Sequence, residues 1–234
     1  MRKALICVVL VLGFAVIAQQ NPVEITSEPH HHLVLENTYV RAFAVNVAPK
    51  ESSLVHRHGH DYLSVSIGDA QIMNARAGAA PVTANFKDGD VRFSTAPLVH
   101  AVTDTGDAPF RNITIELLGP TTGQHACTES CAVAVPCDAA DKAACPSVVK
   151  LMSADQWTVT MVTLPAGARY AQHAHAGSFL LVPLTDADLK TKGQSGPETD
   201  MHRQTGVISW NGPVVHTVTN AGTKAARSVV LEFK

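Results

Sequence analysis

The chain has 234 residues and a formal net charge of −2, so it lacks the basic surplus expected of a nucleic-acid-binding protein. A hydrophobic content of 46% is ordinary for a globular protein and is enough to build two small cores. With 13 prolines, 15 glycines and short β-branched runs, the sequence is typical of strands and turns.

Residues 1–18 have the pattern of a secretory signal peptide. Arg2 and Lys3 precede an apolar run that ends at Ala18, and small side chains at its end predict cleavage before Gln19. The run is shorter than the ~20 residues of a membrane span, although an uncleaved anchor is an alternative. We therefore expect a periplasmic or secreted protein with no stable membrane span after cleavage.

Residues 19–32 are expected to form a polar, mobile leader before a first folded unit over residues 33–118. The leader ends in His30, His31 and His32. We interpret these three histidines as the solvated start of a strand, with weak metal binding as the alternative.

A second histidine cluster begins at His56. Side chains two apart on a strand share a face, so His56 and His58 point the same way. His100 follows His58 by 42 residues. Three imidazoles on one site form a ligand set for a transition metal. Buried, metal-free histidines are the alternative interpretation.

The strand after this cluster alternates in polarity. If Tyr62, Ser64 and Ser66 face a barrel interior, then the residues between them face outward, namely Leu63, Val65 and Ile67. An exposed apolar row on a sheet is an aggregation hazard unless it is covered. We predict that these three residues lie in an interface between the two units or with a second copy of the chain, as in a homodimer.

Residues 119–147 form a linker that contains every cysteine after the signal peptide: Cys127, Cys131, Cys137 and Cys145. An even number of cysteines in an exported chain predicts two disulfides, with three connectivities open. Zinc binding is the alternative, but the spacing lacks the paired C-x-x-C motifs of structural zinc sites.

Residues 148–234 repeat the first unit. His173 and His175 follow the first pair by 117 residues, and His216 follows His100 by 116. The same separation of 116 residues joins Arg111 to Arg227 and Glu116 to Glu232. Alignment of whole flanking segments at one offset indicates an internal duplication.

Two motifs carry a family resemblance. In the second unit, Gly167, His173 and His175 match the opening of G(X)5HXH(X)3–4E(X)6G, and His216 with Asn220 matches the close of G(X)5PXG(X)2H(X)3N. In the first unit Gly89 and His100 keep this spacing, whereas Lys50 takes the place of the glycine and Asp104 that of the asparagine. Over residues 33–118 and 148–234 the chain thus resembles the cupin superfamily in its duplicated, bicupin form.

The resemblance implies an all-β fold of two tandem double-stranded β-helix barrels of jelly-roll type. Each barrel would hold at most one divalent transition metal ion (Fe, Zn, Mn, Cu or Ni). Neither unit has the glutamate that usually follows the histidine pair. The matching slot falls on Tyr62 in the first unit and on Ser178 or Phe179 in the second.

A cupin barrel supports many functions, so fold alone gives no reaction. Our first hypothesis is a metal-dependent enzyme that acts on a small molecule by an oxygenase, lyase or isomerase reaction. A non-catalytic protein that binds a ligand or metal, or a structural barrel, is the alternative. Because Tyr62, Asp61 or His60 could supply or orient further ligation, with Tyr62 and Asp61 as catalytic candidates, we expect the first barrel to bind metal more tightly and to carry the activity.

Overall fold

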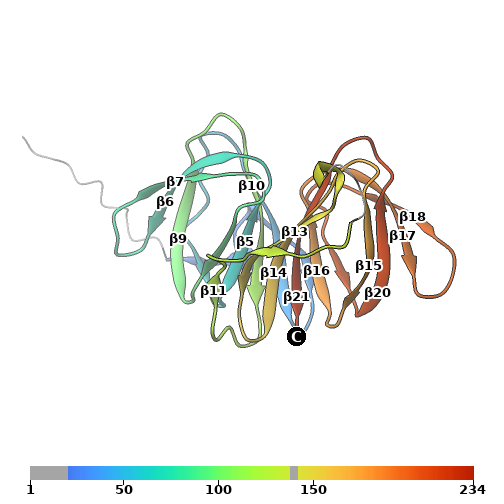
Figure 1. Ribbon diagram of the computed structural model, residues 1–234. Helices are drawn as coiled ribbons and strands as arrows, with labels where there is room; N and C mark the ends of the chain where they lie inside the picture. Colours follow the sequence, from blue (N-terminus) through green and yellow to red (C-terminus); the bar gives the residue numbers. More distant parts are fainter. Residues whose placement is uncertain (1–20, 138–141) are drawn as a thin grey trace, which may run out of the picture.

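Two β-barrels follow one another along the chain and lie side by side (Figure 1). The computed structural model describes residues 21–137 and 142–234, so the predicted signal peptide lies outside the described part. The all-β fold class expected from the sequence is confirmed. Among the described residues, no helix reaches the length and hydrophobicity of a membrane span.

The first barrel consists of two five-stranded sheets with the orders β1-β4-β9-β6-β7 and β2-β3-β10-β5-β8. Its elements are β1 (Val23–Glu24), the 3-10 turn η1 (Ile25–Ser27), β2 (His31–Glu36), β3 (Val40–Val47), β4 (His56–His58), β5 (Tyr62–Ser66), β6 (Ala70–Arg76), β7 (Val82–Phe86), β8 (Val91–Ser94), β9 (Leu98–Asp104) and β10 (Phe110–Leu117).

The second barrel has one sheet of order β11-β13-β14-β21-β16-β19, with β12 paired to β13, and a second of order β15-β20-β17-β18. Its elements are β11 (His125–Ala126), β12 (Ala132–Val133), η2 (Lys142–Ala144), β13 (Ser147–Ser153), β14 (Trp157–Leu164), β15 (Arg169–His175), β16 (Phe179–Pro183), β17 (Ala187–Gly193), β18 (Thr199–Arg203), β19 (Ser209–Asn211), β20 (Val214–Asn220) and β21 (Ala226–Phe233).

The expectation of a mobile leader over residues 19–32 is wrong for the residues that the structure describes. β1 pairs in parallel with β4, which carries the first histidine pair. Ile25 and Glu28 are each only 1% exposed. An apolar side chain and a fully hydrogen-bonded carboxylate therefore anchor this segment to the barrel.

The duplication holds at the level of strand register. β2 pairs with β3 as β13 pairs with β14, and both pairs carry a bulge at the same point, between Leu33 and Leu35 and between Lys150 and Met152. Lys50 has a φ of 67° and its counterpart Gly167 a φ of 72°. Lys50 thus occupies a left-handed position that favours glycine. Its ammonium group donates to the carbonyl oxygens of Thr105 and Gly106.

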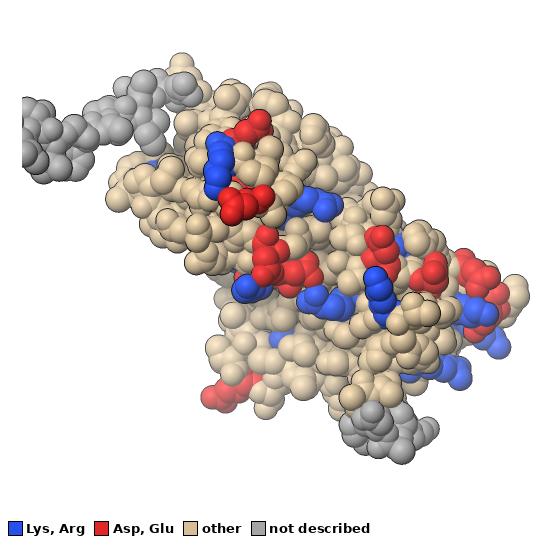
Figure 2. All heavy atoms as spheres, turned by 90° about the horizontal axis from the view of Figure 1, so that it is seen from above, with Lys and Arg blue, Asp and Glu red and all other residues tan. Residues whose placement is uncertain are grey.

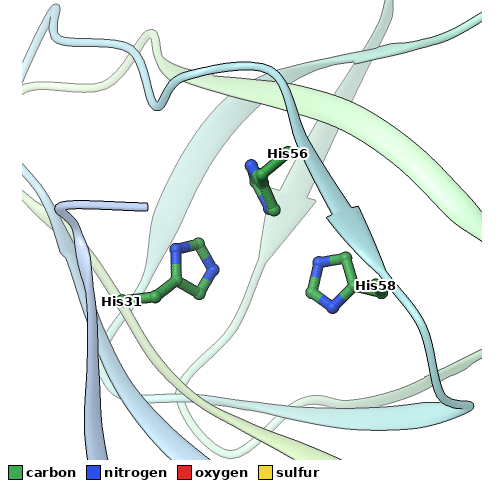
Figure 3. Close-up of side chains that lie close together, drawn as sticks. All are labelled: His31, His56 and His58. Atoms are coloured by element: carbon green, nitrogen blue, oxygen red, sulfur yellow. The ribbon is translucent and has the colours of Figure 1, made fainter. Parts of the chain in front are cut away.

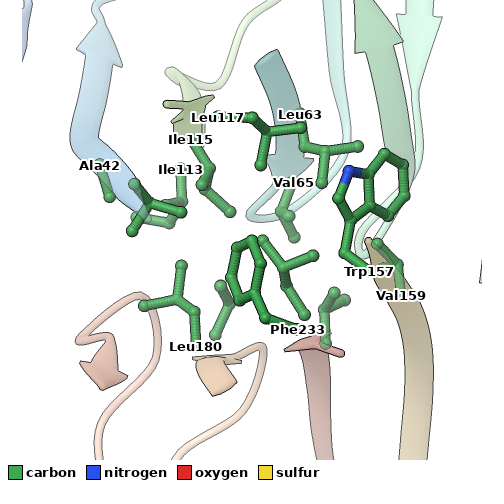
Figure 4. Packing of buried hydrophobic residues seen from close by; sticks show 14 of the residues in the cluster. Ala42, Leu63, Val65, Ile113, Ile115, Leu117, Trp157, Val159, Leu180 and Phe233 are labelled. Carbon is green, nitrogen blue, oxygen red and sulfur yellow. The ribbon is translucent and has the colours of Figure 1, made fainter. Parts of the chain in front are cut away.

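The largest hydrophobic core lies between the barrels. Leu63, Val65 and Ile67 all belong to it, which confirms the predicted interface. They pack with side chains of β14, β16 and β21, among them Trp157 and Leu180 (Figure 4). The outward face of one sheet of each barrel is thus buried by the other barrel, which removes two exposed apolar faces at once.

Polar contacts extend the interface at its edge. Arg227 of the second barrel donates from Nη1 to Oδ2 of Asp88 in the first, at 2.6 Å. Elsewhere on the surface, Lys and Arg side chains alternate with Asp and Glu over the face shown in Figure 2. The inter-barrel contact is therefore mainly apolar, with a charge pair at its rim.

The linker cysteines form two short-range disulfides, Cys127–Cys131 and Cys137–Cys145. This confirms the expectation of two bridges and selects one of the three connectivities. Backbone hydrogen bonds from Cys127 N to Leu151 O and from Lys150 N to Cys131 O hold the first bridged loop against β13. The linker is therefore part of the second barrel's sheet.

Candidate metal centres

The three histidines predicted for the first barrel meet in its interior. His56 and His58 lie on β4, and β9 places His100 directly opposite His56. All three are buried, with exposures of 0%, 1% and 7%. The Nε2 atoms of His58 and His100 are 3.1 Å apart. The strand alternation that grouped these residues in the sequence therefore also groups them in space.

A fourth histidine, His31, joins this cluster, although the sequence favoured a solvated strand start and gave weak metal binding only as the alternative. Its ring lies 4.7 Å from that of His56, and one ring nitrogen from each of His31, His56 and His58 falls within 4.8 Å of the others (Figure 3). The interpretation of His31 as part of a solvated strand start is wrong. Strand β2 pairs with β3 and carries the side chain into the barrel.

Three of the four imidazoles are oriented by a hydrogen bond at Nδ1, whereas the buried Nδ1 of His58 has no hydrogen-bond partner among the described residues. His31 Nδ1 donates to Glu28 Oε2 (2.6 Å), and His56 Nδ1 donates to Leu54 O (2.9 Å). His100 Nδ1 donates to Asn74 Oδ1 (3.0 Å). A proton fixed on Nδ1 leaves Nε2 free as the ligand atom, which is the usual outer-shell arrangement of metal-binding histidines.

Glu28 is the buried carboxylate behind His31. It also accepts hydrogen bonds from His30 and from the backbone N–H of Leu54. Burial by itself would raise the pKa of Glu28, but the hydrogen bonds of His31, His30 and Leu54 lower it to about 2. The carboxylate therefore stays charged and holds the His31 ring in place.

Burial keeps the cluster neutral. Removal from water, assisted by the neighbouring histidines, lowers the pKa of His56 to about 4, of His58 to about 2 and of His100 to about 3. The imidazoles are thus unprotonated at neutral pH, as coordination requires.

The residues fit a bound transition metal. His56 Nε2 is buried and has no hydrogen-bond partner among the described residues. A buried polar atom without a partner is costly, and a metal ion would satisfy it. The Nε2 atoms of His58 and His100 are 3.1 Å apart, which allows both to bind one metal ion at a distance of about 2.0–2.1 Å. The set consists of imidazoles alone, a ligand type that suits Zn, Cu, Fe and Ni.

The structure places the other first-barrel candidates differently. The carboxylate of Asp61 accepts hydrogen bonds from Ala96 N and Thr121 Oγ1, which gives it a structural contact. A catalytic role for Asp61 stays a prediction. His60 is exposed in the turn after β4.

Tyr62 stacks flat on His58, with 4.1 Å between the ring centroids, and burial raises its pKa. In the second barrel, Phe179 stacks on His175 in the same way at 4.0 Å. Because phenylalanine has no hydroxyl, the role that the two residues share is packing against the imidazole. A chemical role for the Tyr62 hydroxyl stays a prediction.

The second barrel repeats the three-histidine geometry. β15 and β20 place His173 opposite His216, and their Nε2 atoms are again 3.1 Å apart. His173 Nδ1 donates to Ala171 O, as His56 does to Leu54 O. One ring nitrogen from each of His173, His175 and His216 lies within 4.8 Å of the others. Burial lowers the pKa of His173, and lowers that of His216 to about 4.

The duplicated glutamates lie behind the second histidine of each pair, but only Glu232 forms a hydrogen bond to it. Glu232 Oε2 accepts from His175 Nδ1 at 3.0 Å. In the first barrel Glu116 Oε1 lies 3.9 Å from His58 Nδ1, because Arg41 binds Oε2 of the same carboxylate at 2.6 Å. The equal offset of the two glutamates in the sequence thus reflects an equal position behind the metal site.

The cavities around the two centres differ in size. The first barrel encloses about 100 Å³ next to its histidines, and the second about 680 Å³. The larger cavity is within the range of small-molecule sites, and the smaller one is well below it. The volumes therefore do not favour the expectation that the first barrel carries the activity, since they offer an organic ligand room in the second barrel.

Comparison with solved structures identifies the fold. AerE from Microcystis aeruginosa is 11% identical, with a TM-score of 0.57 over 88% of this chain and 98% of that one. A cupin 2 conserved barrel domain protein from Leptotrichia buccalis is 12% identical, with a TM-score of 0.52 over 87% and 88%. Bacillus subtilis oxalate decarboxylase, described with Mn(II) centres, is 11% identical, with a TM-score of 0.56 over 87% and 75%. No protein-family model and no curated protein sequence matches the chain.

Proposed function

Starting from a chain with the tandem cupin fold and two histidine metal centres, we propose that this is an exported metalloprotein that acts on a small organic molecule in its second barrel. The observation that carries the proposal is the cavity of about 680 Å³ beside His173, His175 and His216. Three protein ligands leave coordination positions for water or substrate, as in catalytic sites. The cavity beside the histidine cluster of the first barrel, about 100 Å³, has room for water but little for an organic substrate.

The two centres then have different tasks. The first combines four buried imidazoles with a cavity of about 100 Å³. We assign it the tighter metal site and a stabilising role. The second has three partly buried imidazoles and an open position. We assign it the oxygenase, lyase or isomerase reaction expected from the sequence.

The residues of the second site suit such chemistry. A bound metal would supply a Lewis acid that polarises a carbonyl or carboxylate oxygen. Tyr170 lines the cavity and stacks on His173 at 3.8 Å, and burial raises its pKa. Its hydroxyl therefore stays protonated at neutral pH and can donate a hydrogen bond to a bound oxyanion. Glu232 fixes the orientation of His175.

The solved neighbours support a transition metal but not its identity. The neighbour with Mn(II) centres is a decarboxylase, which favours a lyase among the three reaction types. Fe, Zn, Cu and Ni suit imidazole ligands as well. The two disulfides support a periplasmic or secreted location, because such bridges persist in oxidising compartments.

A second candidate function is metal-dependent ligand binding without turnover. The hydrogen bonds of Glu232 favour this alternative, because both of its carboxylate oxygens already accept a hydrogen bond, one from His175 and one from Ala176 N. Among the described lining residues, no other carboxylate is available as a general base. Product analysis after incubation with small carboxylic acids separates the two: turnover supports the enzyme, and binding without product supports the alternative.

The metal sites are tested by two double variants in protein purified without a tag. We expect His56→Ala/His58→Ala and His173→Ala/His175→Ala each to lose one metal equivalent per chain, measured by elemental analysis. His60→Ala is the matched control, because His60 is exposed and outside both clusters. If the second pair leaves the metal content unchanged, the second barrel is not a metal site and the proposed function is wrong.

A further inference from the structure

The interior of the first barrel is filled by aromatic side chains. Phe43, Phe86 and Phe110 are 0%, 7% and 6% exposed and belong to one core cluster. The rings of Phe86 and Phe110 lie 5.4 Å apart. Phe43 contacts the ring of His31, and Phe86 and Phe110 line the small cavity beside the histidines.

The register of the second barrel puts Thr160, Arg203 and Ala226 at the matching positions. For example, Ala70 pairs with Phe86 on β6 and β7, and Ala187 pairs with Arg203 on β17 and β18. All three residues line the large cavity. Replacement of two of the three rings by the small side chains Thr160 and Ala226, and of the third by Arg203, contributes to the larger cavity of the second barrel.

Arg203 is a charged group in this hollow. It is half-buried, and its Nη1 donates to Ser209 Oγ at 2.8 Å. Its Nε is buried and has no hydrogen-bond partner, and no carboxylate among the described residues lies within ion-pair distance. Burial lowers its pKa. A buried cation without a counter-ion is unfavourable, unless a ligand provides the negative charge.

Arg92 of the first barrel has a different environment from Arg203. Arg92 lies over the ring of Phe86 at 3.7 Å and donates to Asn85 O, with its side chain largely exposed. In the second barrel, Arg203 takes the position of Phe86 and Ser209 takes the position of Arg92. Both arginines line the cavity of their barrel, but Arg92 is exposed and its guanidinium lies on the ring of Phe86, whereas Arg203 is half-buried with no ring beneath it in the matching position.

Arg203 and the three histidines line the same cavity, and the backbone positions of Arg203 and His216 lie far apart along β17. On β17, Gly193 pairs with His216 and Ala187 pairs with Arg203. Six residues separate these points, which is about 20 Å along a strand. The wall between them is apolar, with Phe179, Leu181, Leu189, Met201 and Val218.

We propose that the second barrel binds an elongated organic anion. Arg203 binds the carboxylate or a similar anionic group, the apolar wall holds the body of the ligand, and the far end reaches the histidines. The inference depends on the proposed function only for the reaction at the end of the ligand near the histidines, because recognition of the anion by Arg203 needs no metal. A planar guanidinium with donors not used by the protein is suited to bind a carboxylate or sulfonate.

The test uses two fluorescent probes with one aromatic skeleton. 8-Anilinonaphthalene-1-sulfonate carries an anion, and N-phenyl-1-naphthylamine lacks it. We expect Arg203→Ala to weaken binding of the anionic probe about 10- to 100-fold, the range of a charge-assisted hydrogen bond, and to leave the neutral probe unchanged. Arg203→Phe, which restores the residue of the first barrel, should weaken both probes because it fills the cavity.

Lys192→Ala is the control, since Lys192 is an exposed cation on β17 that does not line the cavity. Metal content reports correct folding of each variant. Equal binding of the anionic probe to the wild-type protein and to Arg203→Ala would overturn the inference. Probe binding is also measured in His173→Ala/His175→Ala. If this variant loses its metal but still binds the anionic probe, anion binding at Arg203 does not depend on the metal. The metal analysis then tests the proposed function independently of the anion site.

Discussion

The two barrels have the same three metal-facing histidines in the same register but different interiors. In the first, His31 adds a fourth imidazole and three phenylalanines fill the barrel. In the second, Val148 takes the register position of His31, because Val148 pairs with Val162 as His31 pairs with Val45. The comparison teaches that two barrels can share the register of three histidines and still differ in a fourth imidazole and in the filling of the interior.

The barrel filling gives the largest expected effect. Phe110→Ala removes a buried ring from the first core and should lower the free energy of unfolding by about 3–5 kcal/mol. The reciprocal change Ala226→Phe adds a ring to the hollow barrel and should change stability little while reducing probe binding. Chemical denaturation and dye titration measure both. Similar losses of stability in the two variants would contradict the contrast between a filled and a hollow barrel.

Exchange of His31 and Val148 tests the difference between the metal centres. His31→Val should lower the metal affinity of the first site by more than about 100-fold, because loss of a ligand exceeds the 10- to 100-fold effect of an outer-shell change. Val148→His should raise the metal affinity of the second site by a smaller factor than His31→Val lowers that of the first, since among the described residues no carboxylate takes the place of Glu28 behind it. Competition with a chelator measures both affinities. An unchanged first site in His31→Val would show that three histidines suffice there.

The outer-shell carboxylates should give a smaller effect. Glu28→Gln weakens the hydrogen bond that orients His31, and we expect about 10- to 100-fold lower metal affinity in the first barrel. Glu232→Gln is the matched variant for His175 in the second barrel. Each change should affect only its own site, as read by chelator competition. A loss in both barrels from one variant would point instead to a general effect on folding.

The turn before each histidine pair gives the smallest effect. Gly167→Ala places a Cβ at a φ of 72° and should lower stability by about 1–2 kcal/mol. Lys50→Gly relieves the same conformation in the first barrel but removes hydrogen bonds to Thr105 and Gly106, so the two contributions oppose each other. Thermal unfolding of the two variants measures the difference. Equal stability of Gly167→Ala and the wild type would show that this turn relaxes without strain.

The sequence by itself determined the features that depend on local periodicity and on the repeat. Alternation in β4 and β5 set which side chains share a face, so His56 and His58 met and Leu63 with Val65 became the interface. The offset of 116–117 residues placed the second site and the paired glutamates. The motif comparison placed Lys50 at the position of Gly167, and the structure shows that both residues adopt the left-handed conformation.

Tertiary structure alone decided the rest, because these features join residues that are distant in sequence. His31 reaches the metal centre only when β2 pairs with β3 and Glu28 is buried behind it, and the repeat gave no signal because its counterpart is Val148. Likewise, no local pattern distinguishes a filled barrel from a hollow one. The cavity depends on the summed volume of side chains that strand pairing brings together from the whole unit.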